Sequence, residues 1–189
     1  MTNPFSIVID DKQITDALSG LSAKVSDMSK PMREIGELMV LSTRERFGSS
    51  TGPDGVKWAP NSASTLEAWL RAKGSAHDKD GNRVGWKKGW LRQDGRVSAK
   101  AGAALAGKKP LVASGDMASS ITMQVTGNIL EWGVPVRIKQ GNVMQFGAKK
   151  GAFGPRTPWG DIPARPYLGL SDFDRVSILG VIERYLALS

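Results

Sequence analysis

The chain has 189 residues, of which 40% are hydrophobic, and it contains no cysteine and a single histidine. This composition supplies a core for a single domain spanning residues 1–189, and it excludes disulfides, thiolate nucleophiles and most structural zinc sites. No run approaches the roughly 18 apolar residues needed to cross a bilayer, so we expect no membrane contact.

The excess positive charge lies in one segment. The net charge is +8, and residues 71–109 contain 11 of the 26 basic residues but only three of the 18 acidic ones. The rest of the chain is therefore neutral, with 15 residues of each sign. We interpret residues 72–109 as a basic insertion or arm, rich in Gly, Lys and Trp, within the single domain.

The first half of the chain predicts mainly helix. After a short β-prone run at residues 5–10, apolar residues at helical spacing predict a helix over residues 12–28. Ser29 and Pro31 favour the start of a second helix that ends near Phe47. Because the break between them is short, we favour one kinked helix over a hairpin. A further short helix is expected at residues 65–71.

The second half predicts loops, a hairpin and a closing helix. Residues 72–109 lack a sustained period, so we expect a long loop or arm with at most a helical piece over residues 97–106. Residues 120–125 and 129–134 are predicted strands, and Gly127-Asn128 between them favours a tight hairpin. Residues 136–146 are compatible with a short helix, and residues 172–187 predict a final one.

These elements together predict an α+β fold. Long N-terminal helices and a C-terminal helix are expected to pack on a small antiparallel sheet, with long loops between the elements.

The segment Ile162–Ser171, called the proline segment below, is the most constrained part of the chain. Pro163 and Pro166 each fix φ near about −65° and remove a backbone donor, which excludes a helix or a central strand. Gly169 permits a turn before the final helix. We therefore expect the proline segment to keep a fixed shape. With its single cation, Arg165, it is expected to be a surface that another part or another molecule contacts.

No constellation of residues predicts catalysis. The tight carboxylate pairs, at positions 10–11 and 78/80, fit turn formers and solvated charges better than general acids and bases. The Gly-rich stretches lack the Gly-Lys-Ser/Thr ending of a phosphate loop. The sequence therefore predicts a protein that is not an enzyme, with no catalytic residue, no metal ligand and no cofactor.

Aromatic and basic residues alternate over residues 86–92. Cations can hold phosphates while aromatic rings stack on bases, so this pattern fits contact with nucleic acid. The residues that would make this contact are Lys87, Lys88, Arg92 and Arg96. Two other interpretations stay open: the same residue types anchor protein interfaces, and a solvated loop can pack on its own domain.

Four of the six tryptophans lie in loops rich in Gly and Pro rather than in the periodic segments. Four large rings are difficult to bury in loops of so small a body, and exposed apolar loops indicate assembly surfaces. The interface candidates are therefore Trp58, Trp86, Trp90 and Trp159.

Four blocks of residues, in order, resemble those of phage virion morphogenesis proteins, the tail completion proteins of Mu-like and related tailed phages. The blocks are Phe47 with Gly52–Pro60, Leu111–Met117 with Ser120-Ile121, Gln145–Gly147, and the proline segment with the closing helix. They span about residues 30–188. Two stretches depart from the family: residues 140–144 lack its Tyr-Ala and His, and residues 71–109 are longer than usual.

The resemblance implies a non-enzymatic virion protein at the neck or tail end, made in the host cytoplasm. By analogy it acts in head–tail joining or tail completion as a ring of about six copies. The expected partners are further copies of itself, neighbouring neck, connector or tail proteins, and packaged DNA. Since ring assembly joins different patches of one chain, Arg165 and Tyr167 are expected near a subunit boundary, together with the loop tryptophans. The alternative is a nucleic-acid-binding module that uses residues 71–109.

Overall fold

The computed structural model describes residues 12–92, 94, 96–112, 115–138, 140–154 and 160–187. Within this part of the chain it contains seven helices and two separate antiparallel hairpins of two strands each, which confirms the α+β prediction. The β-prone run predicted at residues 5–10 lies outside the described residues. The chain divides into two compact units, and each is described by itself. The prediction of a single domain stays a prediction.

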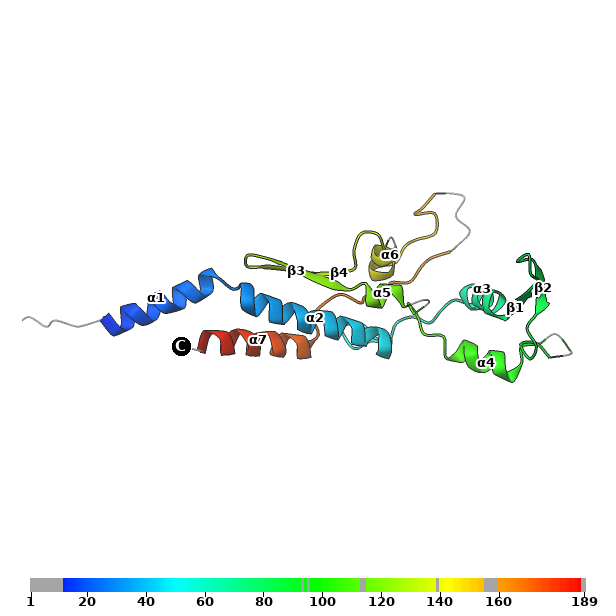
Figure 1. Ribbon diagram of the computed structural model, residues 1–189, viewed down its shortest axis with the longest axis horizontal. Coiled ribbons are helices and arrows are strands. Elements are labelled where there is room, and N and C mark those ends of the chain that lie inside the picture. The colour runs from blue at the N-terminus through cyan, green and yellow to red at the C-terminus, as the bar shows by residue number, and fades with distance from the viewer. Residues whose placement is uncertain are drawn as a thin grey trace, which may run out of the picture. The chain divides into compact units, whose positions relative to one another are not determined.

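The first unit contains residues 1–42, 122–133 and 172–189. Its N-terminal part forms α1 (Lys12–Ser26) and the start of α2 (Ser29–Ser49), as the apolar spacing predicts. Two residues, Asp27 and Met28, separate the helices, and the chain runs on from α1 into α2 instead of folding back (Figure 1). The expectation of a long, interrupted helix is therefore confirmed over an α-hairpin.

The core of the first unit lies between α2 and the closing helix α7 (Asp172–Ala187). The two helices run antiparallel (Figure 1), and Ile35 and Met39 of α2 pack with Val181 of α7. Half-buried apolar residues complete this core: Leu38, Leu130, Trp132, Ile178 and Ile182. Ile178, Val181 and Ile182 repeat at helical spacing, so they share one face of α7, and this face is the one buried against α2.

A hairpin of β3 (Thr122–Thr126) and β4 (Ile129–Gly133) covers α2. It turns at Gly127-Asn128, as predicted, with a positive φ of 58° at Gly127. The hairpin approaches α2 at Gly36, where a Cβ atom would lie 2.8 Å from Leu130 Cδ1 and 2.9 Å from Met123 Sδ. A glycine at this point of α2 therefore lets the sheet pack directly on the helix.

Hydrogen bonds to backbone atoms hold the C-terminal end of α1 in the first unit. The Asn128 side chain accepts from Met28 N–H and donates to the Val25 carbonyl, and the Tyr185 hydroxyl donates to the Asp27 carbonyl. The preceding turns of α1 lie beyond the end of α7 (Figure 1). Among the described residues of this unit, no helix or strand is packed along the greater part of α1 (Figure 1).

The second unit contains residues 43–121 and 134–171. Besides the end of α2 it holds α5 (Asp116–Ser119), α6 (Gln140–Phe146) and the proline segment, which forms neither helix nor a named strand. The short helix compatible with residues 136–146 is therefore present. The proline segment is irregular, as its prolines require.

The remaining elements of the second unit are α3 (Ala63–Gly74), β1 (Ser75–His77), β2 (Arg83–Trp86) and α4 (Ala99–Ala106). The helices at residues 65–71 and 97–106 are confirmed, with shifted ends. The expectation that the rest of residues 72–109 is a loop is wrong, because β1 and β2 pair as an antiparallel hairpin. Residues 63–109 are called the basic module below.

Candidate functional site

The proline segment is held by side chains that bond to its backbone. Arg46, near the end of α2, donates from Nη1 to the carbonyls of Tyr167 and Gly169, at 2.9 and 2.8 Å. Trp58 donates from Nε1 to the Pro166 carbonyl at 2.8 Å. Because its prolines keep this segment out of helices and sheets, its carbonyls lack the backbone donors that those structures supply. The side chains of Arg46 and Trp58 donate to these carbonyls instead.

Gln145 of α6 also forms hydrogen bonds with the main chain of the proline segment. Its Oε1 accepts from the N–H groups of Tyr167 and Leu168, both at 3.0 Å, and its Nε2 donates to the Leu168 carbonyl at 3.0 Å. The Arg165 N–H donates to the Met144 carbonyl at 2.7 Å. Three hydrogen bonds from one amide fix the register of the segment against α6.

Arg165 bonds within the chain. Its side chain is buried, with 7% of the residue exposed, and it donates from Nε to the Ala59 carbonyl and from Nη2 to the Pro60 carbonyl, each at 2.8 Å. Burial lowers the pKa of the guanidinium below its usual value, because desolvation disfavours the charged form. These two donors therefore bond within the chain and not across a subunit boundary.

Three aromatic rings form the centre of this site. The Phe47 ring lies 5.4 Å from the Trp58 ring in an edge-on arrangement and 5.6 Å from the Tyr167 ring. All three residues are buried. Gly169, at a positive φ of 147°, lies against Pro53, since a Cβ there would be 2.7 Å from Pro53 Cγ. The predicted blocks around Phe47, Trp58 and the proline segment thus meet in one packed cluster.

The predicted interface residues fall into three groups. The structure buries Trp58, Arg165 and Tyr167 in the second unit, so the expectation that Trp58 forms exposed loop surface is wrong. Trp86 and Trp90 are half-buried inside the basic module. Trp159 lies outside the described residues. The first three side chains therefore pack within the fold, and their place at a subunit interface stays a prediction.

The Tyr167 phenol gives this cluster a dependence on pH. Burial raises its pKa above the usual 10.0, because desolvation disfavours the phenolate. The unfolded chain loses this proton first, so the free energy of unfolding falls as pH rises from 10.0 towards the folded pKa. We expect the wild type to lose stability relative to Tyr167→Phe as the pH rises from about 10 to about 11 in urea titrations. Identical profiles for the two proteins would contradict the shift.

Tryptophans form the interior of the basic module. The Trp69 and Trp90 rings are 6.3 Å apart, and Gly74 at the end of α3 lies so close that a Cβ would be 2.9 Å from both the Trp86 and Trp90 rings. Ala101 of α4 is fully buried. The module therefore has a small core of its own, which is why residues without helical or strand periodicity still fold.

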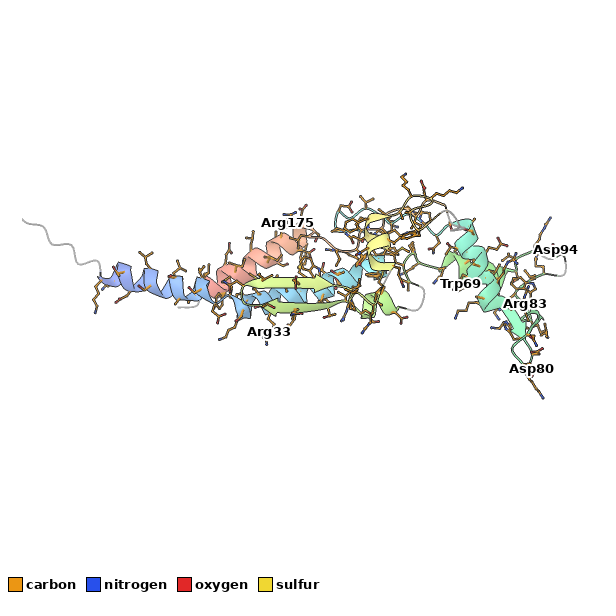
Figure 2. The ribbon with its side chains drawn as sticks, turned by 90° about the horizontal axis from the view of Figure 1, so that it is seen from above. Arg33, Trp69, Asp80, Arg83, Asp94 and Arg175 are labelled. Atoms are coloured by element: carbon orange, nitrogen blue, oxygen red, sulfur yellow. The ribbon has the colours of Figure 1, made fainter. Side chains whose placement is uncertain are left out.

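The four predicted nucleic-acid contacts lie on the outside of this core. Lys87, Lys88, Arg92 and Arg96 are all exposed. Lys87 Nζ donates to the Lys73 carbonyl at 2.8 Å, and Arg96 lies 3.8 Å from Asp94. Figure 2 shows Arg83 on the hairpin and Asp94 on the loop that follows. The structure thus brings these cations onto one module, separate from the proline segment.

Two apolar helix faces of the first unit are exposed, and sequence reasoning did not identify either as a surface. On α1, Leu18, Leu21 and Val25 are between 44% and 61% exposed. On α7, the face opposite the core carries Phe173, Val176 and Leu179, which are between 57% and 79% exposed. The sequence does contain the pattern that marks these faces, because the three apolar residues of each set repeat at helical spacing.

Little in the described residues suggests a catalytic or metal-binding site. A shallow hollow of about 400 Å³ is lined by Arg44, Gly115, Ala118 and Ser119, and Arg44 donates from Nη2 to the carbonyls of Ser119 and Ile121. Among the described residues, no three His, Cys, Asp or Glu side chains gather as metal ligands. In the same part of the chain, no helix is both long enough and apolar enough to cross a membrane.

Comparison with known proteins gives one match. The model of the Phage virion morphogenesis family matches residues 9–83 and 75–187. The two matched segments overlap at residues 75–83, which contain β1 and the turn that leads into β2. No curated protein and no solved structure matches the chain.

Proposed function

Because the chain belongs to the phage virion morphogenesis family, we propose that it is a structural component of a tailed-phage virion, without enzymatic activity, at the neck or tail end. There it acts in head–tail joining or tail completion as one subunit of an oligomeric ring of about six copies. It is made in the host cytoplasm and contacts further copies of itself and neighbouring neck, connector or tail proteins.

The observation that carries this proposal is the pair of exposed apolar faces in the first unit. Leu18, Leu21 and Val25 line one side of α1, and Phe173, Val176 and Leu179 line the outer side of α7. Single exposed apolar residues are ordinary, but three at helical spacing on each of two helices form continuous stripes. Such stripes are typical of surfaces that another helix covers.

The two stripes suit a ring because they belong to different helices of one chain. A ring needs a contact in which one patch of a subunit meets a different patch of the next. We place the α1 stripe of one copy against the α7 stripe of its neighbour. The helices match in length, with 15 and 16 residues, or about 22 and 24 Å at 1.5 Å per residue.

Removing the α1 stripe tests the ring. In the variant Leu18→Gln/Leu21→Gln/Val25→Gln, α1 keeps good helix formers but loses its apolar contact. At about 1.4 kcal/mol for each side chain, we expect association to weaken about thousandfold, so the purified protein shifts from ring to monomer. The measurement is native mass by light scattering. In cells, phage carrying only this variant should accumulate heads and tails that do not join.

The matched control replaces three apolar residues that are at least as exposed but form no stripe. Val56→Gln/Val84→Gln/Val136→Gln removes side chains that are between 63% and 96% exposed. This control is expected to keep the mass and infectivity of the wild type. A ring that survives in the α1 variant, or is lost equally in the control, would refute the proposed contact.

A further inference from the structure

The positive charge of the basic module is not cancelled by its own acids. Within the described residues of the module, Glu67 pairs with Arg71 at 2.6 Å on α3, where both side chains are exposed. Asp78 accepts from the N–H groups of Asp80 and Asn82, at 3.0 and 2.8 Å, and so closes the hairpin turn. Arg96 lies beside Asp94 as well, at 3.8 Å. Most of the other cations over residues 71–109 are exposed, and no acid among the described residues forms a salt bridge with them.

The tryptophans of the module are already engaged. The Arg83 guanidinium lies 4.9 Å from the centre of the Trp86 ring, and Lys108 Nζ lies 5.8 Å from that of Trp69. Trp90 packs on Trp69 and on the backbone of Gly74. Since these rings are occupied by cations and by each other, they do not offer free faces on which unpaired bases could stack.

We propose that the basic module binds the phosphate backbone of duplex DNA without regard to base sequence. A duplex places one phosphate charge at about every 1.7 Å of its axis, and surface cations bind it by releasing counterions. Single strands are instead held largely by stacking, for which this module keeps no open ring. The site lies in the second unit, and the ring contact proposed above uses the first, so the two can be tested separately.

Three residues are suited to carry the contact without supporting the fold. Lys88, Arg92 and Lys100 are exposed, and they lie on the turn after β2, on the following loop and on α4. By contrast, the side chains of Arg83 and Lys87 cover a ring and bond to a carbonyl, so replacing them would also disturb the module.

The test compares two variants of the full chain that have the same net charge. Lys88→Glu/Arg92→Glu/Lys100→Glu reverses three cations of the module, and Arg33→Glu/Lys57→Glu/Arg175→Glu reverses three exposed cations outside it. Binding to a fluorescent 30-base-pair duplex of random sequence is titrated at several salt concentrations. Tryptophan fluorescence and thermal unfolding verify that both variants fold.

We expect the module variant to bind at least about tenfold more weakly than the wild type at 100 mM salt. Its slope of log affinity against log salt should fall by about 2.7, as for three lost phosphate contacts. The control variant should stay within about twofold of the wild type.

Several results would overturn the proposal. These are a wild type that does not bind the duplex, an equal loss in both variants, and tighter binding to the matching single strand. Equal binding to polyglutamate would instead assign the module to an acidic protein surface.

Discussion

Arg165→Glu is expected to destabilise the fold strongly. The guanidinium is buried and donates to the carbonyls of Ala59 and Pro60. Glutamate cannot donate to either carbonyl, and it places an unpaired carboxylate among acceptors that repel it. Since an uncompensated buried charge costs about 3–5 kcal/mol, and domains are stable by only about 5–15 kcal/mol, a large share of the stability is lost. Thermal unfolding followed by circular dichroism measures the effect.

The matched control is Arg175→Glu, ten residues further on, where the arginine is exposed on α7. Substitutions on the surface usually change stability by no more than about 0.5 kcal/mol, so this variant should melt like the wild type. If Arg165→Glu melted within a few degrees of Arg175→Glu, the guanidinium would not be a buried support of the segment. Loss of infectivity in Arg165→Glu alone would therefore report misfolding and not a lost subunit contact.

Tyr167→Ala is expected to lower the free energy of unfolding by about 3–5 kcal/mol. Only 1% of Tyr167 is exposed, and its ring packs against Phe47, so truncation leaves a cavity at the centre of the cluster. The fall should appear as a lower midpoint in urea, with an unchanged slope if the same surface is exposed on unfolding.

Tyr167→Phe is the control for this prediction. It keeps the ring and should remain within about 1.5 kcal/mol of the wild type near neutral pH, since volume-conserving changes are tolerated best. Equal losses in the alanine and phenylalanine variants would show that the hydroxyl, and not ring packing, carries the stability.

The helices and the β3–β4 hairpin could be predicted from the sequence because their signals are local. Ile178, Val181 and Ile182 repeat at helical spacing, and Gly127-Asn128 marks the turn. The basic module could not, since it is held by the rings of Trp86 and Trp90, which meet over Gly74, and by Trp69, which packs on Trp90. A core built from such contacts between distant residues produces no periodic pattern of apolar residues, so the sequence of the module resembles that of a loop.

The candidate site, too, could be predicted from the sequence only in part. The rigidity of the proline segment follows from its own prolines and was predicted. The partners that hold it, Arg46 and Gln145, lie far away in sequence, and nothing near either residue shows that it will bond to residues 166–169. In the sequence Gln145 stands out only as part of the block Gln145–Gly147, and its three hydrogen bonds give that block a structural reason.

The way the proline segment is held has a consequence for how its sequence can vary. Arg46, Trp58 and Gln145 all bond to its main chain. They therefore fix the course of the backbone and do not depend on particular side chains of the segment. Positions such as Ala164 and Leu170, which are exposed, can therefore change between related phages while the path is preserved. A segment held by its main chain can keep one shape while its outer side chains diversify to match different neighbours.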